Sequence, residues 1–415
     1  MTTRIVGRGD RPRLHRDRFT VSLYGYFVAW GWFLYSFNPS VSLLAEDLGI
    51  SNAAAGLHGT AMAVGTIGAA VLGPRLVLRF SRRTAFECAG VLVVTGLAVL
   101  LTGRTLPVTL TAVVLLSVGG STAISAAQAG LALHHGRTAS AAVTEGNAAG
   151  SGIGLLGPLA VGACVGLGWG WRPAVAVSAV LMLLAVVATR RLPMEGALAR
   201  SLPAPAAGRS AGRLDPADPG AAGHEAAGRA ARWFLVTIVT AVSLENATTY
   251  WATDLVIDRT GAGADIATAT TAGLVTGMTV ARLVVGPLSL RMAPARLLAA
   301  AYGVAVVGWA VLWTATVPWA ALVGLFVAGI GYGVHYPIGT ALLLGTADGA
   351  TDRAQARATV AGGAAVGVAP FLLGALADSV GSHTAFLLVP VLAVVGGLAT
   401  LRGAHAWHRA VAAGC

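Results

Sequence analysis

Ionisable side chains are rare inside the long apolar segments of this sequence, and Glu245 is the most informative of them. It lies 13 residues beyond Arg232. At about 1.5 Å rise per residue, a helix would carry its carboxyl to the middle of a membrane. Ionisable groups at that depth are costly and usually functional, and such a carboxyl can bind and release a proton near neutral pH. We therefore predict proton coupling at Glu245. The alternative is a carboxyl that a neighbouring helix satisfies and that only holds structure.

His335 is the second candidate for proton transfer. Tyr332 and Tyr336 flank it, glycines precede it, and Pro337 follows it, which indicates a kinked or locally opened helix. An imidazole titrates near physiological pH, which suits a proton relay. The alternative is a hydrogen-bonded histidine with a packing role.

Amphipathic side chains are the candidates for the wall of a substrate cavity. Trp32, Tyr35 and Asn38 are three residues apart and can form one stripe of a helix. Such rings suit a sugar or an aromatic, partly polar ligand, although aromatic residues on membrane helices also face lipid. The predicted cavity residues are Trp32, Tyr35, Asn38, Gln128, Asn246, Thr249, Tyr250, Trp251, Tyr332 and Tyr336.

The elements that must position these residues follow from composition. Of 415 residues, 56% are hydrophobic and only 11% are charged, with a mean hydropathy of +0.74 in the whole chain. Soluble proteins carry roughly a quarter charged residues, and a membrane helix needs about 20 apolar residues. Unbroken apolar runs such as Val91 to Leu101 exclude the alternation of a β-barrel. We predict an all-α integral membrane protein with twelve spans, near 19–44, 53–76, 84–103, 107–133, 140–167, 172–190, 232–257, 265–290, 295–316, 319–346, 354–379 and 383–402.

The spans divide into two sets of six. The segment between them is rich in Ala, Pro, Gly and Arg and shows no helical periodicity, as expected of a flexible linker. We predict a tail (1–18), a six-helix bundle (19–190), a linker (191–231), a second six-helix bundle (232–402) and a C-terminal tail (403–415).

The arginines predict the orientation. All 28 basic residues are arginine, and most lie between apolar runs on one side, whereas the opposite side holds only Arg104, Arg172 and Arg259. Positive charge favours the cytoplasmic side, so we expect a multi-pass protein of the inner (plasma) membrane with both termini and the linker in the cytoplasm. Basic residues are not interleaved with aromatics on a soluble segment, which argues against nucleic-acid binding.

The two halves also resemble each other in sequence. The second span ends in Leu76-Val-Leu-Arg-Phe80 and the eighth in Leu288-Ser-Leu-Arg-Met292. The fifth span has a glycine series that leads to Gly157 and Pro158, and the eleventh has one that leads to Pro370. We expect these three residues to bend their helices. Such duplication is expected of transporters that rock two halves around a central site.

Twelve spans in two related sixes, a long linker and basic turns after spans two and eight resemble the major facilitator superfamily over nearly the whole chain. The family's loop signature, Gly-x-Leu-Ala-Asp-Arg-x-Gly-Arg-Arg, corresponds to residues 74–83. The resemblance implies a cytoplasmic gate or loop motif at Arg79, Arg82, Arg83 and Arg291. The acidic position is Leu78 here and Leu290 in the second half, so the resemblance supports the fold and not the acidic latch of that motif.

The resemblance implies a secondary transporter that works by alternating access. The Gly-Pro element of the fifth span is similar to that of proton-coupled exporters, which favours efflux of a drug or metabolite. The segment from Val242 to Trp251 is similar to fucose-permease-like members, so a proton-coupled importer of a sugar-like solute is the alternative. A transporter-like sensor without translocation is a further alternative, because both acidic loop positions are lost.

The sequence does not favour an enzyme. It has no nucleophile–base pair, no metal-ligand spacing around its three cysteines, and no Gly-x-x-x-x-Gly-Lys phosphate loop. We expect no catalytic residue, no metal and no cofactor. The expected partners are a small-molecule substrate, protons and membrane lipid, and we expect the protein to be monomeric.

Overall fold

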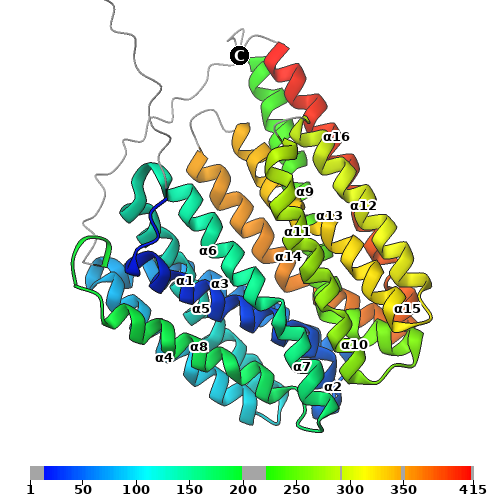
Figure 1. The fold of residues 1–415 in the computed structure, drawn as a ribbon. Helices are drawn as coiled ribbons and strands as arrows, with labels where there is room; N and C mark the ends of the chain where they lie inside the picture. Colours follow the sequence, from blue (N-terminus) through cyan, green and yellow to red (C-terminus); the bar gives the residue numbers. More distant parts are fainter. Residues whose placement is uncertain (1–13, 199–220, 290–291, 347–350, 413–415) are drawn as a thin grey trace, which may run out of the picture.

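A computed structural model describes residues 14–198, 221–289, 292–346 and 351–412, and these residues form helices joined by short connections (Figure 1). The helices of the first half are α1 (Arg18–Phe37), η1 (Asn38–Ser40), α2 (Val41–Leu48), α3 (Asn52–Arg79), α4 (Arg82–Thr102), α5 (Leu106–His135), η2 (Gly136–Thr138), α6 (Ala139–Gly154), α7 (Leu156–Gly166), α8 (Arg172–Arg190) and η3 (Gly196–Leu198). Those of the second half are α9 (Ala221–Thr260), α10 (Ala264–Thr270), α11 (Ala272–Ser289), α12 (Pro294–Thr314), α13 (Pro318–Gly345), α14 (Thr351–Val380), α15 (Ser382–Ala385) and α16 (Leu388–Ala412).

Local sequence signals explain where several helices begin. Asp17, Ser51 and Ser81 are the N-cap residues of α1, α3 and α4, and each side chain accepts a hydrogen bond from a backbone N–H in the first turn. A capping oxygen satisfies a donor that the helix itself leaves without a partner. The helices therefore begin close to the predicted spans.

The two halves are built with the same pattern of packing. In the first half α1 packs against α6 and α8, α5 against α3 and α4, and α4 against α8. In the second half α9 packs against α14 and α16, α13 against α11 and α12, and α12 against α16. These are the equivalent pairs of the two sets of six spans. The predicted all-α fold of two related six-helix halves is confirmed.

Eleven helices of the described residues are long and apolar enough to cross a membrane. The first predicted span, 19–44, is not among these eleven and is divided into α1, η1 and α2. The division falls at Asn38–Ser40, where Pro39 lacks the N–H that a continuous helix would need. The fifth and eighth spans are also divided, between α6 and α7 and between α10 and α11.

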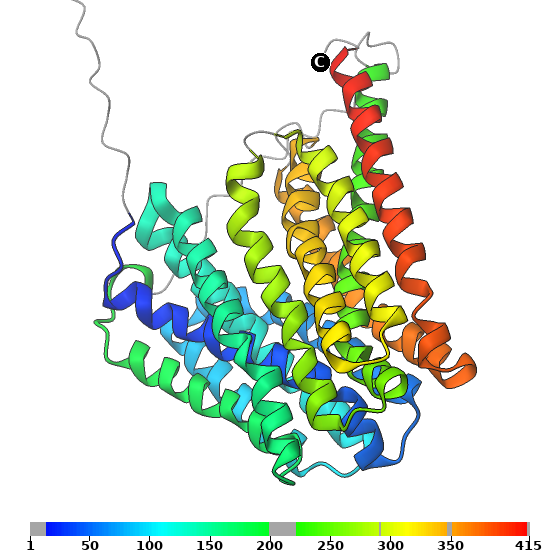
Figure 2. The ribbon, with the colours of Figure 1, turned by 45° about the vertical axis from the view of Figure 1, so that its right-hand side comes forward.

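Two segments differ from the predicted organisation. The linker was expected to extend to residue 231 and the tail to begin at 403, but α9 begins at Ala221 and α16 continues to Ala412. The extended ends pack against each other: Ala230 of α9 belongs to a hydrophobic cluster against which Ala406 and Trp407 of α16 pack. This mutual packing stabilises helix in segments whose own hydropathy gives no sign of it. Figure 2 shows the two ends projecting together beyond the rest of the bundle.

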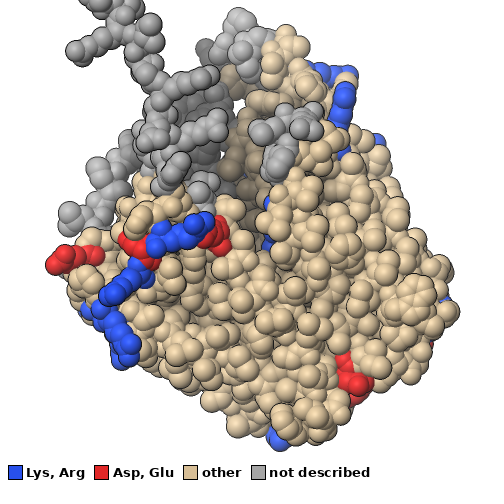
Figure 3. Space-filling model, viewed as in Figure 1, with Lys and Arg blue, Asp and Glu red and all other residues tan. Residues whose placement is uncertain are grey.

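Charged side chains lie mainly toward the two ends of the molecule. On the face in Figure 3, wide areas between these ends carry no charge, as a surface that meets lipid requires. We call the end with Arg79, Arg296 and Arg402 the arginine-rich end. The opposite end, with the loops around residues 104, 172 and 259, is the arginine-poor end.

Candidate functional site

A central cavity of about 340 Å³ lies between the two halves. This volume is in the range of small-molecule binding sites. The cavity is lined from α1, η1, α3 and α5 of the first half and from α9, α13 and α14 of the second. Its lining residues are Trp30, Leu34, Tyr35, Asn38, Met62, Ala63, Thr66, Ser121, Val242, Glu245, Asn246, Thr249, Tyr336, Thr359, Gly362, Gly363 and Val366.

Helical spacing brings these side chains onto common faces. On α9, Val242, Glu245, Asn246 and Thr249 lie within two turns and share one face. The Thr249 hydroxyl donates to the Glu245 backbone carbonyl at 2.6 Å, and the Asn246 amide donates to the Val242 carbonyl at 2.9 Å. These bonds use the Thr249 hydroxyl and the Asn246 amide as donors to the backbone of their own helix.

Glu245 is the one charged side chain among the described residues that line the cavity. It is half-buried, in contrast to its fully buried neighbour Leu244. The Arg282 guanidinium on α11 interacts with it electrostatically. Because an isolated charge at membrane depth is costly, an opposite charge nearby makes the ionised carboxylate tolerable there.

Arg282 also links the two halves. Its Nη1 donates to the Ser151 hydroxyl of α6 at 2.7 Å, and its Nε donates to the Gly333 carbonyl of α13 at 3.3 Å. Tyr35 of α1 interacts electrostatically with both Arg282 and Glu245. The result is a polar group of side chains that crosses the interface beside the cavity.

The halves are joined closely at the arginine-poor end. There α3 packs against α14, and α7 against α10. A Cβ atom on Gly56 of α3 would lie 2.8 Å from the backbone of Phe371 on α14, which shows how closely the two helices approach. Toward the arginine-rich end the molecule is hollowed between the halves (Figure 3). The structure is therefore closed at one end and open at the other.

Six of the predicted substrate and proton residues line the cavity together, and the other six, His335 among them, do not. The residues in the cavity wall are Tyr35, Asn38, Glu245, Asn246, Thr249 and Tyr336. Outside it, Trp32 donates to the Ala174 carbonyl at 2.8 Å and Trp251 to the Pro370 carbonyl at 2.8 Å. Tyr332 shares a 3.0 Å hydrogen bond with Thr248, Tyr250 is buried, and Gln128 is half-buried on α5 away from the cavity.

His335 lies inside the second half rather than at the cavity. Its ring stacks on Tyr302 with centroids 4.0 Å apart, and only 1% of its surface is exposed. The observed position corresponds to a packing histidine between α12 and α13.

The predicted loop arginines hold the start of the linker. Arg82 donates to the Ala197 carbonyl and Arg83 to the Leu192 carbonyl, both just beyond α8. Arg79 is exposed and lies 5.7 Å from the centre of the Phe80 ring. Arg291 is outside the described residues.

The three residues expected to bend helices lie where two helices of this chain approach each other closely. Gly157 and Pro158 are in the first turn of α7, just beyond the division at Leu155. Pro370 is inside the continuous helix α14 and has no N–H for the carbonyl of the preceding turn. Gly367 lies about one helical turn before Pro370 on α14, and its carbonyl accepts a 2.5 Å hydrogen bond from the Thr60 hydroxyl of the first half.

Sequence reasoning missed much of the first-half wall. Trp30, Leu34 and Asn38 recur every four residues and all line the cavity, whereas the predicted stripe was placed at intervals of three. The four-residue spacing was visible in the sequence. Nothing in the sequence singled out Met62 or Ala63, and the glycine series that contains Gly362 and Gly363 was interpreted as a repeated helix-bending element rather than as part of a cavity wall.

The chain is similar in fold to several solved transporters. The nucleoside transporter NupG shares 12% identity, with a TM-score of 0.71 over 93% of this chain and 98% of that chain. A bacterial homologue of the human lysosomal transporter Spinster, in an inward-facing and unoccupied conformation, shares 12% identity, with a TM-score of 0.72 over 97% of this chain and 99% of that chain. The partially occluded, inward-open xylose transporter XylE from E. coli shares 15% identity, with a TM-score of 0.69 over 92% of this chain and 96% of that chain.

No curated protein sequence matches the chain significantly. The family model described as Major Facilitator Superfamily matches residues 21–263 and 233–410, which together cover most of the chain. This family consists of transporters and not of enzymes. With its two related halves and the cavity between them, the chain belongs to the major facilitator superfamily and is a multi-pass secondary transporter of small molecules.

Proposed function

We propose that this transporter is coupled to protons through Glu245 and exports a neutral or cationic small molecule. The observation that carries the proposal is the position of Glu245 as the one charged side chain among the described residues of the cavity wall. A proton and a cationic group neutralise the same carboxylate and so exclude each other. That competition is what exchange of a proton for a substrate requires.

The orientation provides the loading state that export requires. The positive-inside tendency puts the arginine-rich end in the cytoplasm, so the open cavity would receive substrate from inside the cell. The carboxylate releases its proton to the cytoplasm, binds the substrate, and is protonated again after the halves have rocked to the other side. We propose a monomer in the plasma membrane, because each chain contains a complete cavity.

His335 is assigned a packing role in this scheme rather than proton transfer. It is separated from the cavity and stacks on Tyr302 inside the second half. Arg282 is assigned a positioning role, since it interacts electrostatically with Glu245 and bonds to Ser151 across the interface.

The test measures pH inside proteoliposomes during substrate movement, with a panel of lipophilic cations and sugars. Glu245→Gln should abolish substrate-driven proton movement. Glu145→Gln is the matched control, because Glu145 carries the same carboxyl but pairs with Arg16 at 2.5 Å outside the cavity. His335→Gln should retain coupling. Proton movement that persists in Glu245→Gln, or transport unaffected by collapse of the proton gradient, would refute the proposal.

Uptake of a sugar-like solute is the second candidate. The rings of Trp30, Tyr35 and Tyr336 and the amides of Asn38 and Asn246 surround the cavity, a combination that suits a ring-shaped polyol. In that case protons move in the same direction as the sugar. Binding without movement of either would favour a sensor.

A further inference from the structure

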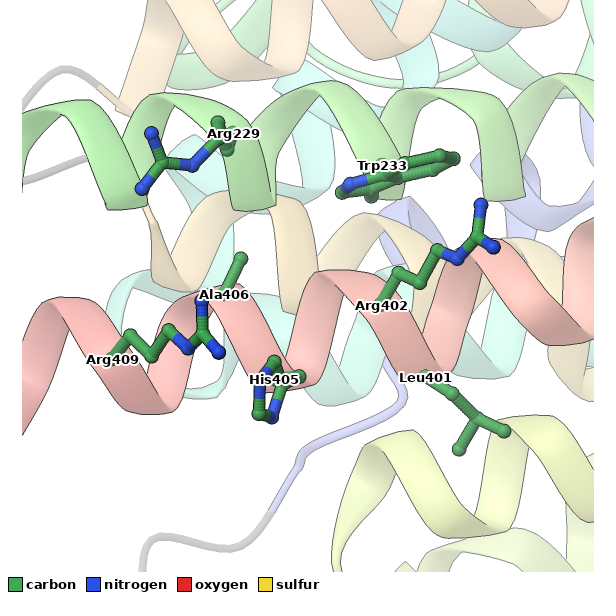
Figure 4. A pocket seen from close by; sticks show the side chains of 7 residues that line it. All are labelled: Arg229, Trp233, Leu401, Arg402, His405, Ala406 and Arg409. Atoms are coloured by element: carbon green, nitrogen blue, oxygen red, sulfur yellow. The ribbon is translucent and has the colours of Figure 1, made fainter.

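A basic pocket lies at the arginine-rich end, apart from the central cavity. It is about 370 Å³ in volume and lies where the extended ends of α9 and α16 pack together. Its lining residues are Arg229, Trp233, Leu401, Arg402, His405, Ala406 and Arg409 (Figure 4). Neither the cavity wall nor the transport cycle uses these residues.

The pocket is formed by facing stripes of two helices. Arg229 and Trp233 are one turn apart on α9, and Arg402 and Arg409 are two turns apart on α16. In Figure 4 the two α16 arginines extend toward α9 on either side of Ala406. The small side chain of Ala406 leaves room between them.

The charge of the pocket is only partly neutralised. Arg229 pairs with Glu225 at 2.5 Å, and Arg402 lies 5.3 Å from the centre of the Trp233 ring, a cation–π contact. Arg402 and Arg409 are exposed, and in the part of the chain that the structure describes neither forms an ion pair. Two guanidinium groups are thus available to bind an anion, and guanidinium binds phosphate oxygens well.

The pocket lies at the level of lipid headgroups. From His224 to Thr260, α9 is a candidate membrane-spanning helix of 37 residues, or about 55 Å at 1.5 Å per residue. The hydrocarbon core is only about 30 Å thick, so the helix extends beyond it. From Asp254 near the arginine-poor end to Trp233 is about 32 Å. Trp233 therefore lies at the boundary of the core, where tryptophan is enriched, and Arg229 lies one turn farther out.

The pocket is apolar at one end and basic at the other, in the same order as the acyl chain and the headgroup of a phospholipid. Leu401, at the end nearer the hydrocarbon, is 49% exposed. Arg409 is eight residues farther along α16, or about 12 Å. A free phosphate would use the guanidinium groups and leave the exposed Leu401 without a contact.

We propose that this pocket binds the phosphate headgroup of an anionic phospholipid, with Arg402 and Arg409 on the phosphate and an acyl chain along Leu401. The lipid bridges α9 and α16, the first and last spans of the second half, at the end where the halves open. Bridging of this kind stabilises the extended helix ends.

Thermal unfolding in detergent, titrated separately with phosphatidylglycerol, phosphatidylcholine and inorganic phosphate, tests the proposal. We expect phosphatidylglycerol to raise the unfolding temperature at a lower concentration than phosphatidylcholine or inorganic phosphate does. In Arg402→Gln/Arg409→Gln the half-saturating concentration should rise about 25-fold, at about fivefold per arginine. The matched control is Arg75→Gln/Arg296→Gln, which removes two exposed arginines outside the pocket and should change it less than about twofold.

A second variant separates shape from charge. Ala406→Phe fills the space between the arginines and keeps every charge, so it should weaken phosphatidylglycerol binding while the lipid-free unfolding temperature stays near wild type. Equal weakening in the control pair would reduce the effect to general surface charge and overturn the proposal. Equal stabilisation by inorganic phosphate would overturn the lipid as ligand in favour of a soluble anion.

Discussion

The carboxylate of Asp378 in the last turn of α14 caps the beginning of α3 in the other half. Its Oδ1 accepts from the Asn52 backbone N–H at 2.9 Å, and its Oδ2 accepts from the Ala53 N–H at 2.7 Å. A negative charge at a helix N-terminus satisfies free donors and is favoured by the helix dipole. Because the bonds join the two halves at the arginine-poor end, they exist only while that end is closed.

Asp378→Ala should shift the protein toward states that are open at the arginine-poor end. Hydrogen bonds to charged groups contribute about 1.5–3 kcal/mol, so the ratio of open to closed molecules should rise about tenfold or more. Electron–electron distance measurements between spin labels at Leu167 and Trp319, in a background without native cysteines, report the opening. Ser379→Ala is the control, because the Ser379 hydroxyl bonds only within its own helix. Unchanged distances in Asp378→Ala would rule out the latch.

Gly363→Leu should block substrate binding without unfolding the protein. Gly363 lines the cavity, and a Cβ atom there meets nothing within 4 Å, so a larger side chain enters open space. We expect the affinity for any cavity ligand to fall about tenfold or more, since the side chain occupies a large part of the site. Gly303→Leu on α12, also without a neighbour within 4 Å, is the control for helix effects. Equal affinity in both variants would place the binding site elsewhere.

Gly31→Val should destabilise the first half. A Cβ atom on Gly31 of α1 would lie 2.4 Å from the Gly150 carbonyl oxygen of α6, so any side chain forces the two helices apart. Overpacking of this kind costs about 1–3 kcal/mol. The unfolding temperature should fall by several degrees in Gly31→Val and much less in Gly152→Ala, whose Cβ meets nothing within 4 Å. Similar losses in both variants would show that the close approach of Gly31 to Gly150 is not the cause.

The cap of α1 predicts a pH dependence of stability. The Asp17 side chain, which lies outside the membrane-spanning helices, accepts from the Thr20 backbone N–H at 2.8 Å and contacts His134 Nε2 at 2.7 Å. Burial would raise the pKa of Asp17, but the hydrogen bonds from Thr20 and His134 outweigh burial and lower it to about 2, from an ordinary value of 3.8. A carboxyl whose pKa is lower in the folded state stabilises the fold above its unfolded pKa. That contribution is lost as the pH falls from about 4 to about 2.

Asp17→Ala should therefore be less stable than wild type by about 1 kcal/mol at neutral pH, the usual effect of losing an N-cap. The difference in unfolding temperature should shrink as the pH falls below about 4, because protonation removes the charge from the wild type as well. Asp17→Asn keeps a capping oxygen without the charge and should lie between the two. A wild-type advantage that stays constant down to pH 2 would contradict the assigned pKa.

Hydropathy determined the spans, and repeated sequence motifs showed that they form two related sets. Apolar runs of about 20 residues have few alternatives in a membrane, because every backbone group must be satisfied within a helix. Glu245 was identifiable for the same reason: a carboxyl is conspicuous in an apolar segment. These features depend on composition and spacing along the chain.

The faces of the helices were decided only by tertiary structure. A membrane helix is apolar toward lipid and toward its neighbours, so its periodicity does not show which side faces a cavity. Trp32 packs against α8 and His335 stacks on Tyr302, so neither side chain lines the cavity. The extended ends of α9 and α16 became helical because each covers the other, a long-range contact between residues that are far apart in the sequence.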